Sequence, residues 1–134
     1  MFVLNAKVTL EDATESFVHI GCSGPNITAE LNTHIETLPE QAWQATQVDS
    51  TTILRLPGHH PRYEIFGDLD ACTKLWSAMD VRAAPVGEPA WSLLDIEAGL
   101  PIIGNELADA FVPQMTNMQL VNGVSFKKGC YTGQ

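Results

Sequence analysis

The residues best suited to chemistry lie in the last eight positions of the chain. Lys127 to Gln134 includes two lysines, two glycines, a cysteine and an amide. Glycines on both sides of Cys130 favour a tight turn that presents the sulfur, and Lys128 would lower the thiol pKa and favour the reactive thiolate. Such a thiolate could bind iron, accept an adduct or undergo disulfide exchange. The alternative is a small apolar side chain buried in a loop.

A second group of polar side chains precedes this stretch. Glu97 stands at the end of a predicted helix, just before a glycine-containing stop. Its carboxylate could accept two parallel N–H bonds from an aminopyrimidine-like edge, or it could be an ordinary solvated acid. Gln114, Thr116 and Asn117 are neutral donors and acceptors of the kind that line pockets, and they are equally suited to hydrogen bonds within turns.

The elements that must position these residues begin with an α+β pattern over residues 1–88. Apolar alternation and turn residues predict strands and helices in the order strand, helix, strand, strand, helix, strand. This order favours a ferredoxin-like split βαβ sandwich, an antiparallel sheet with helices on one face. The strands of this order are expected at 16–22, 51–56, 62–66 and, as a closing edge strand, 81–86, and its helices at 25–38 and 69–79. Two further strands are expected at 3–10 and 43–48.

The two helices are predicted from apolar stripes. Ile27, Leu31, Ile35 and Leu38 recur at spacings of four, four and three residues, and Pro39 ends that pattern. The second stripe includes Cys72, which we therefore expect in the core, and Asp68 is suited to cap the helix. Cys22 is also expected to pack.

Residues 89–134 differ in character and form a predicted helix-loop segment. Ser92 can cap a short helix with Asp95 as a partial capping box, and Gly99 and Pro101 stop it. Loops then lead to the final eight residues.

Composition bounds the class of protein. The 134 residues are 45% hydrophobic and 17% charged, which is typical of one globular domain. The formal net charge of -9 disfavours direct nucleic-acid binding. A local basic patch at Arg55, Arg62 or Lys127–Lys128 is still compatible with this net charge. The sequence contains neither a run of 18 apolar residues nor a visible signal peptide, so we expect a cytoplasmic protein without membrane association.

The sequence also bears on metal binding. Three widely spaced cysteines form no zinc pattern, so free thiols and no metal site are expected.

The final eight residues, Lys-Lys-Gly-Cys-Tyr-Thr-Gly-Gln, resemble the signature of the YgfZ family, folate-binding relatives of the glycine cleavage T-protein. Residues 111–118 and 123–126 are similar to the segment that precedes that signature. Residues 95–101 resemble a helix end shared with the T-protein, and residues 4–10 resemble the entry into the family's middle domain. The resemblance implies that the N-terminal and C-terminal barrel domains of the family lie outside this chain, which is expected to be a fragment.

The resemblance also implies roles for individual residues. Cys130 would be the functional thiol, assisted by Lys128, and Glu97 would contact tetrahydrofolate. The other expected folate-binding residues are Gln114, Asn117, Tyr131 and Gln134.

The implied function is that of a tetrahydrofolate-binding accessory protein rather than a classical enzyme. It would support the assembly or repair of iron–sulfur enzymes, including those that modify tRNA, and its partners would be these enzymes or their assembly machinery. The alternative is a T-protein-like, tetrahydrofolate-dependent aminomethyltransferase. A third possibility is a sandwich domain whose cysteine only packs.

Overall fold

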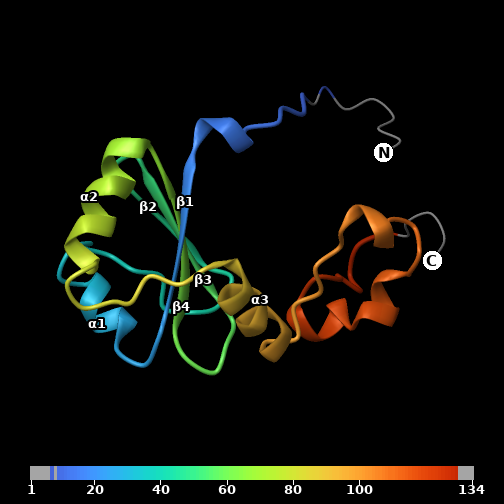
Figure 1. Cartoon of the computed structure of the whole chain (residues 1–134). Helices are drawn as coiled ribbons and strands as arrows, with labels where there is room; N and C mark the ends of the chain where they lie inside the picture. The colour runs from blue at the N-terminus through green and yellow to red at the C-terminus, as the bar shows by residue number, and fades with distance from the viewer. Residues whose placement is uncertain (1–6, 8, 130–134) are drawn as a thin grey trace.

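A four-stranded antiparallel sheet forms the centre of the computed structural model, which describes residue 7 and residues 9–129 (Figure 1). The strand order is β1-β4-β3-β2. In register, Ile20 of β1 and Ile53 of β3 both lie opposite Ile65 of β4. The strands are β1 (Val18–Ser23), β2 (Ala45–Val48), β3 (Thr51–Leu56) and β4 (Arg62–Gly67).

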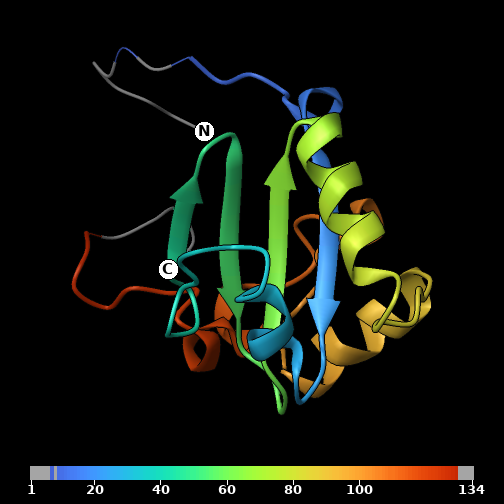
Figure 2. The ribbon, with the colours of Figure 1, turned by 90° about the vertical axis from the view of Figure 1, so that its left-hand side faces the viewer.

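Two helices, α1 (Ile27–Leu31) and α2 (Leu69–Met79), cover one face of this sheet (Figure 2). Apolar side chains of the sheet alternate toward these helices and form one core. The architecture confirms the predicted α+β class, and it is consistent with a ferredoxin-like split βαβ domain. The core cluster comprises Ile20, Cys22, Ile27, Leu31, Ile35, Ile53, Tyr63, Ile65, Cys72 and Met79.

Helix α2 is the element that the sequence predicts best. It begins after Asp68, whose carboxylate accepts a hydrogen bond from the Ala71 amide at 2.8 Å. This is the N-cap that the sequence predicts. Cys72 faces the core as expected, and its thiol donates to the Val18 carbonyl at 3.6 Å.

Helix α1 is shorter than predicted. Regular helix ends at Leu31, although Ile35 is buried and Leu38 is partly buried, as the apolar stripe predicts. Residues 32–34 form turns instead, and the Thr33 hydroxyl donates to the Glu30 carbonyl at 2.7 Å. Asn and Thr side chains compete with helical hydrogen bonds in this way.

The predicted closing strand at 81–86 is wrong. These residues form turns and irregular chain, with hydrogen bonds from Arg82 and Ala83 back to the Met79 carbonyl. In the described part of the chain, β1 therefore pairs on one side only, with β4. The strand expected at 3–10 lies mostly outside the described residues, and residues 9 and 10 are not in a strand.

Helix α3 (Glu88–Glu97) follows, on the side of the sheet away from α1 and α2 (Figure 1). It begins after Gly87, not at Ser92, whose hydroxyl instead donates to the Glu88 carboxylate within the helix at 2.9 Å. The rest of the described chain has short 3-10 turns: η2 (Asn105–Leu107), η3 (Pro113–Thr116) and η4 (Met118–Val121), besides η1 (Thr14–Ser16) near the start. Within the described ranges, no helix combines the length and apolar character that a membrane span requires.

Candidate functional site

Glu97 is the last residue of α3, and its side chain is exposed. The helix ends as the sequence predicts: Gly99 adopts a left-handed φ of 70°, and the Leu100 amide donates to the Asp95 carbonyl at 2.9 Å. This hydrogen bond closes the helix in the manner of a Schellman motif. The Glu97 carboxylate and the negative end of the helix dipole together make this end of α3 an acceptor for N–H donors.

A buried arginine attaches α3 to the sheet. The guanidinium of Arg62, at the start of β4, donates from Nη2 to the Asp95 carboxylate at 2.6 Å and from Nη1 to the Leu94 carbonyl at 2.8 Å. Arg62 is only 1% exposed and the Asp95 side chain 15% exposed. Arg62 therefore does not contribute to a surface basic patch, although the sequence leaves this position open for one.

An aromatic contact completes this attachment. The Arg62 guanidinium lies over the Trp91 ring, 4.5 Å from its centroid. Trp91 packs on the backbone of Gly21, where an added Cβ would come within 2.7 Å of the ring. Gly21 is therefore required by the close approach of α3 to β1 rather than by a turn.

Gln114, Thr116 and Asn117 lie in and just after η3. Gln114 and Asn117 are exposed, and Asn117 adopts a left-handed φ of 58° between η3 and η4. The Thr116 hydroxyl donates to the Pro113 carbonyl at 2.9 Å, which is the turn bonding that was the alternative to a pocket role. None of the three lines either of the two cavities described below.

The signature is only partly described. Lys127 and Lys128 are exposed, whereas Cys130, Tyr131 and Gln134 lie outside the described residues. The predicted effect of Lys128 on the Cys130 thiol therefore stays a prediction.

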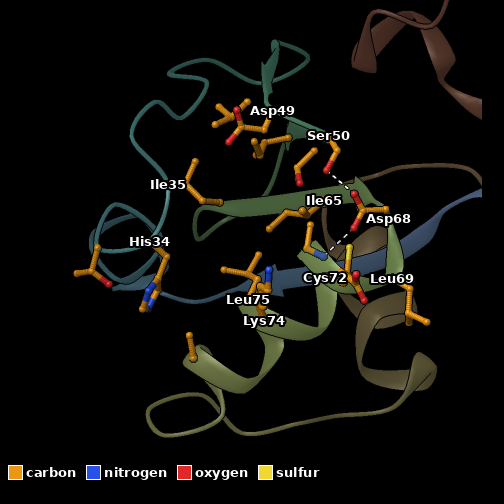
Figure 3. A pocket seen from close by; sticks show the side chains of 17 residues that line it. His34, Ile35, Asp49, Ser50, Ile65, Asp68, Leu69, Cys72, Lys74 and Leu75 are labelled. Atoms are coloured by element: carbon orange, nitrogen blue, oxygen red, sulfur yellow. Dashed lines mark hydrogen bonds between the residues drawn. The ribbon is translucent and has the colours of Figure 1, made fainter.

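A cavity of about 920 Å³ is lined by α2, by residues of β2, β3 and β4, and by the turns after α1 (Figure 3). Thr33, His34 and Ile35, from the turns that follow α1, form part of its lining. Apolar side chains, among them Ile35, Ile65 and Leu75, meet acidic groups at its rim, Asp49 and Asp68. Asp68 accepts a 2.5 Å hydrogen bond from the Ser50 hydroxyl.

A second cavity, of about 720 Å³, lies along the unpaired side of β1. The segment predicted as the closing strand forms its far wall, together with Trp76 and Trp91. Among the predicted site residues that the structure describes, Glu97, Gln114, Asn117 and Lys128 line neither cavity.

The two described thiols are structural. Burial raises the pKa of Cys22 to about 11. The pKa of Cys72 is also raised, by burial and by the nearby Asp68 carboxylate. Both cysteines are free, and at neutral pH both are held as thiols, as expected for core residues.

Comparison with known proteins finds relatives that match almost the whole chain. It is 34% identical over 133 residues to the "tRNA-modifying protein YgfZ" of Klebsiella pneumoniae and 34% identical over 134 residues to that of Colwellia psychrerythraea. It is 35% identical over 133 residues to the protein of the same name from Yersinia pestis. Each match covers 99% of this chain. The resemblance to the YgfZ family is thereby confirmed.

The match is to a part of the YgfZ proteins. The chain spans 40% of the length of each of these relatives. No protein-family model matches the chain.

The attachment of α3 is what sequence reasoning missed. Arg62 and Asp95 are 33 residues apart, and nothing local to either residue indicates a partner. The one available signal is Gly21 inside a strand, since such a glycine often marks a close backbone approach.

Proposed function

We propose that this chain is the folate-binding part of a YgfZ-type accessory protein, which supports the assembly or repair of iron–sulfur enzymes, including enzymes that modify tRNA. The observation that carries the proposal is the match to YgfZ proteins along 99% of the chain. The name of those relatives, "tRNA-modifying protein YgfZ", favours this function over that of an aminomethyltransferase.

The residues at the end of α3 are chemically suited to tetrahydrofolate. The pterin of folate presents an aminopyrimidine edge of N–H donors, and the exposed Glu97 carboxylate is an acceptor for such an edge. The helix end adds partial negative charge at the same place. The anionic glutamyl tail of folate requires cations, for which Lys127 and Lys128 are the candidates in this segment. Gln114 and Asn117 would add neutral hydrogen bonds.

Folate would supply a reduced pterin that carries one-carbon groups, while this chain's own residues bind and orient it. Because Glu97 is exposed in the described structure, other parts of the whole protein would have to form the walls around it. In the proposal, Cys130 is the thiol that acts on the iron–sulfur partner, with Tyr131 and Gln134 beside it.

The test uses cells that lack their own YgfZ protein. The protein is supplied in its native form, as Cys130→Ala, and as the control Cys22→Ala, which removes a thiol that the structure buries in the core. At matched abundance, the native protein and the control are expected to restore the activity of an iron–sulfur tRNA-modifying enzyme, and Cys130→Ala is not. Equal restoration by all three forms would remove the thiol from the proposal, and no restoration by the native protein would contradict the accessory role.

A further inference from the structure

We infer that Arg62 is a positioning residue, which holds Glu97 in place for its ligand by fixing α3 against the sheet. The inference rests on the proposed function for the identity of that ligand. The attachment itself rests on geometry: the guanidinium contacts the two residues Leu94 and Asp95, in the turn of α3 that leads directly to Glu97.

The contacts of Arg62 constrain α3 in more than one direction. Its Nη2 bonds to a side chain of the helix and its Nη1 to the helix backbone, at 2.6 Å and 2.8 Å. The same Nη1 lies 3.4 Å from the Pro57 carbonyl in the β3–β4 loop. A planar guanidinium with several fixed donors sets orientation as well as distance, which a lysine ammonium does not.

The aromatic contact adds a third restraint. The Trp91 ring contacts both the guanidinium and the backbone of Gly21, so β1, β4 and α3 meet at one place. Trp91 is one helical turn before Asp95, and this spacing puts both side chains on the same face of α3. The helix is thus held at two successive turns.

Because α3 is a rigid helix, the restraint at Asp95 also fixes the position of Glu97. Each residue of an α-helix advances about 1.5 Å, so Glu97 lies about 3 Å along the axis from Asp95. Exposed residues of α3 such as Leu93 and Ile96 provide no comparable anchoring. A helix freed from Arg62 would move its last turn, and displacements of about 1 Å are enough to weaken a directional interaction severely.

The experiment compares Arg62→Gln and Asp95→Asn with a matched control, Arg55→Gln, in the whole protein that contains this chain. Arg55 lies on the neighbouring strand β3, over the Tyr63 ring at 5.7 Å, and donates to the Glu40 carbonyl at 2.6 Å. It thus offers the same chemistry, with contacts to Tyr63 and Glu40 in place of α3. Arg62→Lys is included as a conservative variant.

Two measurements are made well below the melting temperature of each variant. Hydrogen–deuterium exchange of the α3 amides is expected to accelerate in Arg62→Gln and Asp95→Asn, with exchange of α2 unchanged. The dissociation constant for tetrahydrofolate is expected to rise at least about 10-fold in both. Arg55→Gln should leave both quantities at native values, and Arg62→Lys should fall between.

The outcomes separate this inference from the proposed function. Faster exchange in α2 and α3 alike, with an unchanged dissociation constant, means that Arg62 only stabilises the fold and overturns the inference. If the native protein binds no tetrahydrofolate, the proposed function fails, and exchange of α3 alone decides the positioning role. If Arg62→Gln does not fold, Asp95→Asn and Arg62→Lys provide the same comparison.

Discussion

Two regions of this molecule differ in how their conformation is held. The sheet region, residues 18–79, contains every buried residue in the described part of the chain. The C-terminal segment, residues 98–129, has none, and large apolar side chains stand in solvent there. Examples are Phe111 at 54%, Met115 at 70% and Phe126 at 75% exposed. Helix α3 joins the two regions through the Arg62 attachment.

The region that has the buried core is not the region that has the family motifs. The specific family motifs lie mainly in the C-terminal segment, which is held by local turns and not by a core. Left-handed residues such as Asn117 and Asn122 end its 3-10 turns. A segment that exposes this much apolar surface is typical of one that another part of a protein covers. The sheet region, by contrast, has the core that a stable unit requires.

The largest expected effect contrasts one substitution in the two regions. Ile65→Ala removes a fully buried side chain and is expected to lower the free energy of unfolding by about 2–5 kcal/mol. Ile103→Ala, at a side chain 53% exposed, is expected to change it by less than about 0.5 kcal/mol. Urea unfolding of both variants measures the difference, and equal losses would mean that the C-terminal segment has a core of its own.

Thiol reactivity gives the next contrast. With a pKa of about 11, Cys22 has little thiolate at pH 8, and burial also blocks access. Alkylation of Cys22 and Cys72 by iodoacetamide is expected to be at least about 100-fold slower in the native protein than in urea. Cys130 is expected to react in the native protein. Mass spectrometry of the labelled peptides tests this, and rapid native labelling of Cys22 would contradict the packing described here.

Two glycine-to-alanine substitutions test the attachment of α3. In Gly21→Ala the new Cβ would meet the Trp91 ring at 2.7 Å, so the ring must move, and we expect a loss of about 1–3 kcal/mol in the free energy of unfolding. Gly104→Ala meets no atom within 4 Å and should be close to neutral. Thermal unfolding of the two variants is the measurement, and a neutral Gly21→Ala would show that Trp91 does not pack on β1.

The smallest expected effect is a pH dependence at the start of α2. Hydrogen bonds from the Ser50 hydroxyl and then the Ala71 amide lower the pKa of Asp68 below its ordinary value. A lowered folded-state pKa stabilises the protein above the unfolded pKa of about 3.9, and this contribution is lost as the pH falls through the lower folded value. The stability difference between the native protein and Asp68→Ala should therefore be constant near pH 6 and shrink below about pH 4. Urea midpoints measured at both pH values test it, and a constant difference would contradict the assignment.

Local patterns predict much of the sheet region. Helix α2, its Asp68 cap and the core position of Cys72 follow from periodicity and capping chemistry, because these signals lie within a few residues of each other. The errors arise where the local sequence is compatible with more than one backbone conformation. Residues 32–34 form turns after α1, where the Thr33 hydroxyl donates to the Glu30 carbonyl. Residues 81–86 have strand-forming residues but no strand pairing in the structure.

Local sequence patterns predict less of the candidate site. The end of α3 at Glu97 follows from Gly99, yet its anchoring depends on Arg62, a contact across 33 residues that no local pattern encodes. The roles expected for Cys130, Tyr131 and Gln134 come from resemblance, and these residues lie outside the described part of the chain.

The most direct test of the account is the affinity of the whole protein for tetrahydrofolate, measured by calorimetry for the native form, Glu97→Gln and Glu106→Gln. Glu106 is an exposed acid in η2 and serves as the matched control. We predict that the native protein and Glu106→Gln bind equally, and that Glu97→Gln binds about 10- to 100-fold more weakly because a charge-assisted hydrogen-bond acceptor is lost. Absence of native binding, or equal binding by all three forms, would contradict the assignment of Glu97 as the folate contact.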